Sequence, residues 1–196
     1  MMELTVDPRA RGLIFDLDGT LVDSMPLHYE AWREVCTKIG FDFTENFFYA
    51  HAGMSSDRIF REIRELMNGD FDPDKLSDEK ERIYESKIPK LTMIEPVFKI
   101  VKDNFSKLPM SIGTGSPSGH SWKAMKAMGL DRYFTIVVGK EEISKPKPAP
   151  DTFLKCAEKM NVEPQYCQVF EDGDFGLQAA MAAGMIATDI RLYINS

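Results

Sequence analysis

The chain has 196 residues, of which 43% are hydrophobic, enough for one well-buried core and a small accessory lobe. Its 31 acidic residues outnumber the 24 basic ones, and the formal net charge of -7 opposes association with nucleic acid or anionic membranes. No stretch is apolar for long enough to cross a bilayer or to form a signal peptide, so we expect a cytoplasmic protein whose three cysteines are reduced core residues.

Short apolar runs alternate with amphipathic helical patterns over most of the chain. Strands are predicted at 12–16, 110–114, 135–139, 167–172 and 185–190, and helices at 95–105, 118–128, from a capping Asp151 onward and at 176–183. Gly129 and Gly184 follow two of these helices and are predicted as left-handed helix ends. This alternation predicts the α/β class: a Rossmann-like core with a parallel five-stranded sheet.

Residues 25–90 differ from the rest, because they show helical periods without a convincing strand. Helices are predicted at 27–39, 58–67 and 77–88, with a polar loop at 68–78. An all-helical insertion directly after the first strand is typical of a lid over the strand ends. We therefore expect an α/β core domain at 1–24 and 91–196 and an inserted α-helical cap domain at 25–90.

Acidic residues follow the predicted strands. Asp16 and Asp18 leave the first strand, and Glu171 and Asp172 leave the fourth. Ligands of open parallel sheets bind at these carboxyl ends, where unit charges ~4 Å apart repel by about 4 kcal/mol at a protein surface. Oxygen ligands without nearby His or Cys favour Mg²⁺ as the compensating cation. Asp16 and Asp18 can face the same side, so that one acts on a substrate while the other handles its proton.

Residues suited to a phosphate group follow the second and third strands. Thr114 and Gly115, in SIGTGS, place a hydroxyl and backbone N–H groups ahead of a helix, although such a segment taken alone is more often an ordinary turn. Lys147, in the stiff segment KPKPAPD, could supply a fixed positive charge. Lys145 is the competing candidate, because both lysines precede a proline.

Four ordered segments, FDLDGTLVDS, SIGTGS, KPKPAPD and FEDGDFGLQAAMAAGM, resemble the motifs of the haloacid dehalogenase-like hydrolases, in the β-phosphoglucomutase-like branch with a helical cap. The resemblance implies that Asp16 is the nucleophile that forms an aspartyl phosphate, while Asp18 protonates the leaving oxygen and then activates water. It implies Mg²⁺ bound by Asp16, the Asp18 carbonyl and Asp172, with Glu171 as a direct or water-mediated ligand. The phosphate would be bound by the set Thr114, Gly115 and Lys147.

Three segments, AWREVC, GTGS and KPAPDTFLKCA, the last two overlapping these motifs, resemble the bacterial fructose-1-phosphate phosphatase branch. They imply a Mg²⁺-dependent phosphatase for a small phosphate ester, a sugar phosphate such as fructose 1-phosphate. We expect the protein to be a monomer. His28 and Trp32 resemble a pair near the active site of sugar-phosphate members, with packing inside the cap as the alternative. Arg58 and His51 are further cap candidates, and solvent exposure is the alternative for Arg58.

Two other functions stay open at this point. Sugar-phosphate mutases of the β-phosphoglucomutase type carry a hydrophobic residue at the position of Thr20 and grip a second phosphate with cations. Here the corresponding regions read HAGMSSDR and SPSG, which favours hydrolysis. A catalytically silent sugar-phosphate-binding protein is the other alternative, and the intact pair Asp16 and Asp18 argues against it.

Overall fold

The computed structural model describes residues 3–51 and 54–194. These residues form a five-stranded parallel sheet in the order β5-β4-β1-β6-β7, which confirms the predicted core. Its strands are β1 (Gly12–Phe15), β4 (Met110–Gly113), β5 (Val137–Val138), β6 (Cys167–Glu171) and β7 (Ile186–Asp189). The β5 strand is shorter than predicted, because only Val137 and Val138 pair with β4.

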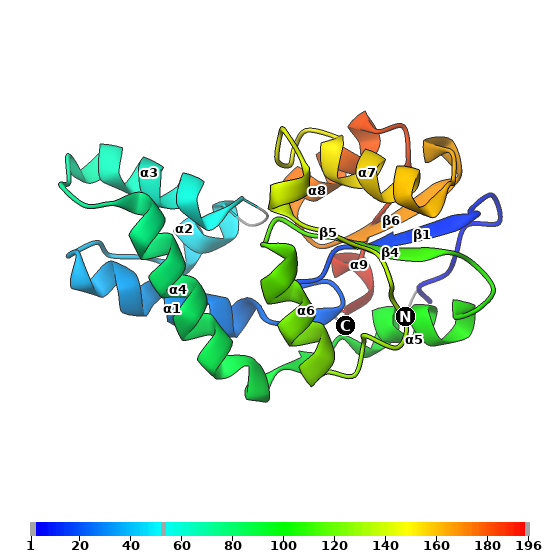
Figure 1. Ribbon diagram of the computed structural model, residues 1–196, viewed down its shortest axis with the longest axis horizontal. Helices are drawn as coiled ribbons and strands as arrows, with labels where there is room; N and C mark the ends of the chain where they lie inside the picture. Colours follow the sequence, from blue (N-terminus) through cyan, green and yellow to red (C-terminus); the bar gives the residue numbers. More distant parts are fainter. Residues whose placement is uncertain (1–2, 52–53, 195–196) are drawn as a thin grey trace.

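Helices cover both faces of the sheet (Figure 1). On one face lie α5 (Glu95–Asn104) and α6 (Ser118–Ala127), and on the other α7 (Asp151–Met160) and α8 (Asp174–Ala182). Leu13 and Phe15 of β1 pack into the first layer, and Ile14 packs into the second. A strand buried on both faces needs a continuous apolar run, and β1 could be predicted because its sequence, GLIF, is such a run. The shorter helical segments are η1 (Ile88–Lys90), η2 (Lys140–Glu142), η3 (Pro164–Tyr166) and α9 (Arg191–Ile194).

The predicted glycine helix ends are confirmed, since Gly129 and Gly184 have φ values of 67° and 71°. The start of α7 differs from the prediction. Pro150 occupies its N-cap position, and Asp151 is the first helical residue. The Asp151 side chain instead accepts a hydrogen bond from the backbone N–H of Lys145 at 3.0 Å.

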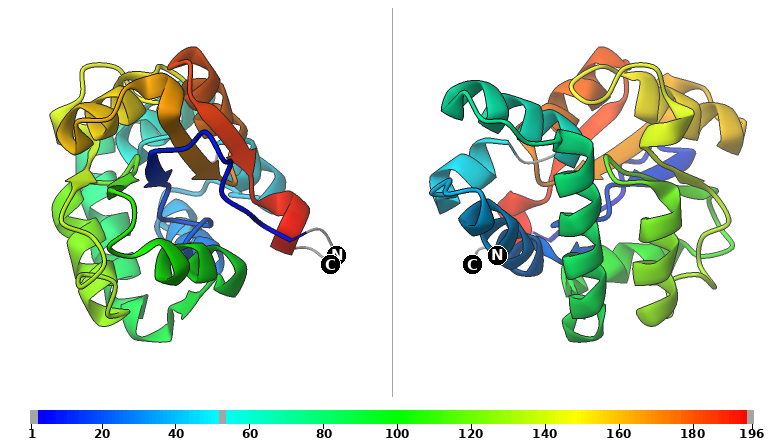
Figure 2. Two further views of the ribbon diagram at one scale, coloured as in Figure 1. Left: turned by 90° about the vertical axis from the view of Figure 1, so that its right-hand side faces the viewer. Right: turned by 60° about the vertical axis from the view of Figure 1, so that its left-hand side comes forward.

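Helices α1 (Met25–Lys38), α2 (Glu45–Ala50), α3 (Ser56–Met67) and α4 (Pro73–Lys87) gather to one side of the sheet (Figure 1, Figure 2). We call this insertion the helical cap. It has its own apolar cluster, made of Trp32, Val35, Cys36, Phe43, Phe48, Ile59, Phe60 and Ile63. The α4 helix begins inside the predicted loop 68–78, with Asp72 as its N-cap and Pro73 in its first turn, so that part of the loop prediction is wrong.

The two chain segments that connect the parallel sheet to the helical cap form a strand pair with each other. Strands β2 (Val22–Asp23) and β3 (Thr92–Met93) form a small antiparallel sheet that was not predicted, because two residues are too few to show a period. An isolated bridge joins Val22 to Asp18. The linkers are thus tied together directly beside the first acidic motif.

The three cysteines, Cys36, Cys156 and Cys167, are buried free thiols, as predicted. Over the described ranges, no helix has the length and apolar character that a membrane crossing requires.

Candidate active site

Three acidic side chains converge at the carboxyl edge of the sheet. Asp16 follows β1, while Glu171 ends the neighbouring strand β6 and Asp172 follows it. One carboxylate oxygen from each of the three lies within 4.8 Å of the others. Adjacent parallel strands bring their ends to one edge, so Asp16 meets the other two acids although about 155 positions of the chain lie between them.

Lys147 is the lysine that reaches this cluster. Its ammonium lies 2.6 Å from Asp16 Oδ1 and 2.8 Å from Glu171 Oε1, and its side chain is 1% exposed. Lys145 is exposed, which resolves the competition between the two lysines for this position. Burial lowers the pKa of Lys147, but attraction by Asp16 and Glu171 raises it more, so the group stays charged.

The acids are not neutralised by this one lysine. Burial raises the pKa of Asp16 well above its usual range, and Glu171 and Asp172 add to the rise against the attraction of Lys147. Burial and repulsion by Glu171 raise the pKa of Asp172 to about 7. A cation among the oxygens would favour the ionised forms, and an all-oxygen set suits a hard divalent ion. The donor set therefore fits Mg²⁺.

Neighbouring groups fix the orientation of the acids. Glu171 Oε2 accepts the backbone N–H of Gly173 at 2.7 Å, and the Thr20 hydroxyl donates to Asp172 Oδ1 at 2.8 Å. Gly19 has a φ of +85°, and a Cβ there would stand 2.4 Å from Asp172 Oδ2. Glycine is thus required at this position both by the backbone conformation and by the close approach.

Asp18 lies beneath the helical cap and is surrounded by donors. Ser24 Oγ is 2.7 Å and His28 Nε2 is 3.1 Å from its Oδ1. Tyr84 and Ser116 hydroxyls approach its two oxygens at 3.4 Å. Burial raises the pKa of Asp18, but His28 and Ser24 more than offset this and lower it to about 2. Sequence reasoning identified His28 as a candidate and missed the three hydroxyl groups.

The predicted phosphate-binding segment faces the same cavity. Thr114 and Gly115 follow β4 and line the cavity with Asp16, Asp18 and Asp172. Thr114 is 2% exposed, and its hydroxyl accepts the backbone N–H of Ser116 at 3.0 Å. The structure thus brings the SIGTGS segment to the acidic cluster, ahead of α6.

The candidate residues of the helical cap have different positions. His28 lines the cavity and also packs within the cap, stacking on Tyr84 with ring centroids 3.7 Å apart. Trp32 lines the cavity too, and it stacks on Phe43 at 5.0 Å. His51 lines the cavity and contacts Glu62 at 3.0 Å. Arg58 is exposed and lies outside the cavity lining.

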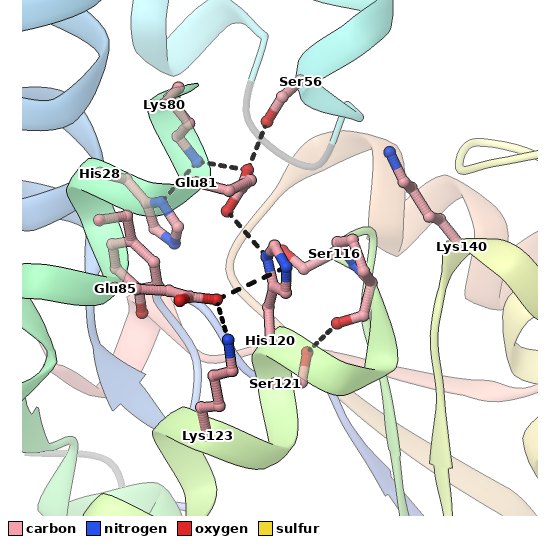
Figure 3. Close-up of polar contacts among 12 residues, drawn as sticks. His28, Ser56, Lys80, Glu81, Glu85, Ser116, His120, Ser121, Lys123 and Lys140 are labelled. Carbon is pink, nitrogen blue, oxygen red and sulfur yellow. Dashed lines mark hydrogen bonds and ion pairs between the residues drawn. The ribbon is translucent and has the colours of Figure 1, made fainter. Parts of the chain in front are cut away.

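Two adjacent charged residues of α4, Lys80 and Glu81, also line the cavity, and sequence reasoning missed them (Figure 3). Both are buried, and their side chains form an ion pair at 2.9 Å. Lys80 Nζ also lies 2.8 Å from His28 Nδ1. A charged pair on a helix is usually solvated, and only the packing of α4 against neighbouring elements shows otherwise.

A family model described as haloacid dehalogenase-like hydrolase matches residues 13–189. The fructose-1-phosphate phosphatase YqaB of Escherichia coli is 44% identical over 184 residues, which cover 94% of this chain and 98% of the relative. A phosphorylated carbohydrates phosphatase of Thermotoga maritima is 27% identical, with 88% of this chain and 81% of the relative covered. A solved structure of beta-phosphoglucomutase from Clostridium difficile has a TM-score of 0.84 at 26% identity, covering 92% of this chain and 84% of that chain. The chain therefore belongs to the haloacid dehalogenase-like hydrolases and is a phosphatase of that family.

Proposed function

We propose that the protein is a Mg²⁺-dependent phosphatase that hydrolyses a sugar phosphate, such as fructose 1-phosphate, through an aspartyl phosphate on Asp16. The observation that carries the proposal is the position of Asp16, which contacts Lys147 within the acidic cluster and lines one cavity with Asp18 and Thr114. The substrate class is supported by the printed activity of the Escherichia coli relative, which matches the chain over nearly its whole length.

In the proposed reaction, an Asp16 carboxylate oxygen bonds to phosphorus while the bond from phosphorus to the sugar oxygen breaks. Asp18 gives its proton to that leaving oxygen, then takes a proton from the water that hydrolyses the aspartyl phosphate. A pKa of about 2 keeps Asp18 ionised at neutral pH, which is the form that the second step needs. A bound phosphate dianion would raise the pKa of Asp18 by repulsion, which favours the protonated form that the first step needs.

The phosphate oxygens would be held by the Thr114 hydroxyl, the Gly115 N–H and the Lys147 ammonium, which resists deprotonation. Mg²⁺ would be held by Asp16, Asp172 and the backbone carbonyl of Asp18, with Glu171 directly or through water. When bound, the ion supplies neutralisation of the charge that the transferring phosphoryl group carries.

A mutase of the beta-phosphoglucomutase kind is the second candidate, since one solved structure of that name has a similar fold. A mutase must hold a second phosphate away from the metal site, where an acid that already pairs with a cationic group competes with the phosphate for it. Among the described cavity-lining residues, each lysine and histidine already contacts an acid: Lys80 with Glu81, Lys140 with Asp57, His51 with Glu62, and His28 with Asp18. This pairing favours a substrate with one phosphate.

The proposal is tested by phosphate release from a panel of sugar phosphates, with Mg²⁺ present and then chelated. We expect release that depends on Mg²⁺ and is abolished by Asp16→Asn. Asp174→Asn is the matched control, because Asp174 is a nearby but exposed acid whose partner is Arg191. Full activity of Asp16→Asn would contradict a mechanism through an aspartyl phosphate on Asp16. Tight sugar-phosphate binding without turnover in the unaltered protein would favour a silent binding protein, and conversion of glucose 1-phosphate to glucose 6-phosphate would favour a mutase.

A further inference from the structure

Glu81 of α4 and His120 of α6 face each other where the helical cap meets the core (Figure 3). Glu81 Oε2 and His120 Nδ1 are 3.6 Å apart, close enough for an ion pair but too far for a good hydrogen bond. Both atoms are buried, and no described residue hydrogen-bonds to either of them. Buried polar atoms are normally paired, so two facing ones without partners indicate a place for a further polar group.

The rest of the Glu81 carboxylate is firmly held. Its Oε1 accepts from Lys80 Nζ at 2.9 Å and from Ser56 Oγ at 2.8 Å. The side chain is 8% exposed. Burial raises the pKa of Glu81, but Lys80 and His120 more than offset this, so the pKa lies well below its usual range and the group is ionised. Oε2 is thus a fixed, charged acceptor.

A small cavity adjoins the residues Glu81 and His120. This cavity is lined by Glu81, His120, Asp18 and Ser116, among others, and Asp18, Glu81 and Ser116 also line the active-site cavity. Such a space suits about one water molecule or one hydroxyl group. Since Glu81 Oε2 and His120 Nδ1 are 3.6 Å apart, an oxygen can lie about 2.8 Å from both. Asp18, the proposed acid for the leaving oxygen, borders the same space.

We infer that Glu81 Oε2 and His120 Nδ1 form a specificity subsite for one hydroxyl group of the alcohol that the phosphatase releases. The hydroxyl donates its proton to Glu81 and accepts from the ring N–H of His120, linking the helical cap to the core. This inference rests on the proposed function and defines its substrate class. A fixed carboxylate attracts a hydroxyl group and repels a second phosphate or a carboxylate, so the subsite selects a neutral alcohol with at least one hydroxyl group besides the oxygen that is released.

The test compares two substrates in each variant: fructose 1-phosphate, and phenyl phosphate, whose uncharged leaving group has no hydroxyl besides the oxygen that is released. The readout is the ratio of the two kcat/KM values. Glu81→Gln keeps an oxygen for Lys80 and Ser56 but removes the charged acceptor. We expect it to lower the ratio about 10- to 100-fold, the loss that corresponds to one hydrogen bond to a charged group.

Variants of His120 give a second, independent test. The His120 side chain is 31% exposed, so this position tolerates replacement better than a buried one. His120→Leu removes the donor and should lower the ratio about tenfold. His120→Asn places an amide near the position of Nδ1 and should restore the ratio at least in part. This rescue would not follow if His120 only filled space.

Glu85→Gln is the matched control. Glu85 lies one turn further along α4 and also contacts His120 at 3.5 Å, but it does not line the active-site cavity. It should leave the ratio within about twofold of the unaltered protein. The inference is overturned if Glu81→Gln leaves the ratio unchanged, if it lowers both kcat/KM values equally, or if Glu85→Gln lowers the ratio as much. Failure of the proposed function looks different, since the unaltered protein would then release no phosphate from any sugar phosphate.

Discussion

Gly19 and Asp172 lie so close together that a Cβ on Gly19 would stand 2.4 Å from Asp172 Oδ2. The contact joins the first acidic motif to the last across 153 positions of the chain, and it leaves the Asp172 carboxylate little freedom to move. The Thr20 hydroxyl holds the other oxygen of the same carboxylate at 2.8 Å. Two adjacent residues of the first motif therefore position one proposed metal ligand.

Replacing Gly19 with alanine should displace Asp172 and lower kcat/KM by about 10- to 100-fold, the usual effect of disturbing a group that orients a metal ligand. Steady-state kinetics over a range of Mg²⁺ concentrations would measure it. Gly40→Ala is the matched control, because Gly40 also has a positive φ, +74°, but nothing lies within 4 Å of its Cβ position. Gly40→Ala should cost about 1–2 kcal/mol of stability and leave the kinetics unchanged. Equal kinetic effects in both variants would mean that backbone strain, and not Asp172, is responsible.

Thr20→Val preserves the shape of the side chain and removes the hydroxyl that donates to Asp172 Oδ1. We expect the Mg²⁺ concentration for half-maximal activity to rise about tenfold. Thr20→Ser keeps the hydroxyl and should stay close to the unaltered protein. If valine leaves the Mg²⁺ dependence untouched, the hydrogen bond does not position a metal ligand.

Asp172 should make the metal-free protein less stable as the pH rises. Its pKa is raised from 3.8 to about 7 in the folded state, so between these values the folded state binds the extra proton. Stability therefore falls as the pH rises from about 4 to about 7. Asp172→Asn should raise the melting temperature in EDTA at pH 8 and have less effect at pH 5, while abolishing phosphate release. A melting temperature that falls at pH 8 would contradict the predicted repulsion.

Lys147→Met should reduce kcat/KM by at least about 100-fold, because it removes a fixed cation from the place where the phosphate oxygens are proposed to bind. Lys145→Met is the control, since Lys145 is exposed and two residues away. It should leave kcat/KM unchanged. Similar losses in both variants would show that the positive charge of the segment matters more than the position of Lys147.

Elements with a long or fully buried pattern could be predicted from the sequence. The run GLIF identified β1 because both faces of the strand are covered, and Gly129 identified a helix end because the position needs a positive φ. The β2 and β3 strands have only two residues each and show no period. The start of α4 was missed although Asp72 and Pro73 are typical of a helix start, because the polar residues around them also fit a loop.

The candidate site could be predicted as far as it follows strand ends. Asp16, Thr114 and Glu171 stand directly after or at the end of strands, so the topology of a parallel sheet is enough to bring them together. The contact between Glu81 and His120 could not be predicted, since each lies on a helix and the two meet only through the docking of the helical cap against α6. No local pattern encodes such a contact.

The most direct test of the account is to stop the reaction during turnover of fructose 1-phosphate labelled in its phosphate, and to locate the label by peptide mapping. The label should be found on the peptide that contains Asp16 and be absent from Asp16→Asn. Phosphate release without label on that peptide, or label on a different residue, would contradict the proposed aspartyl phosphate.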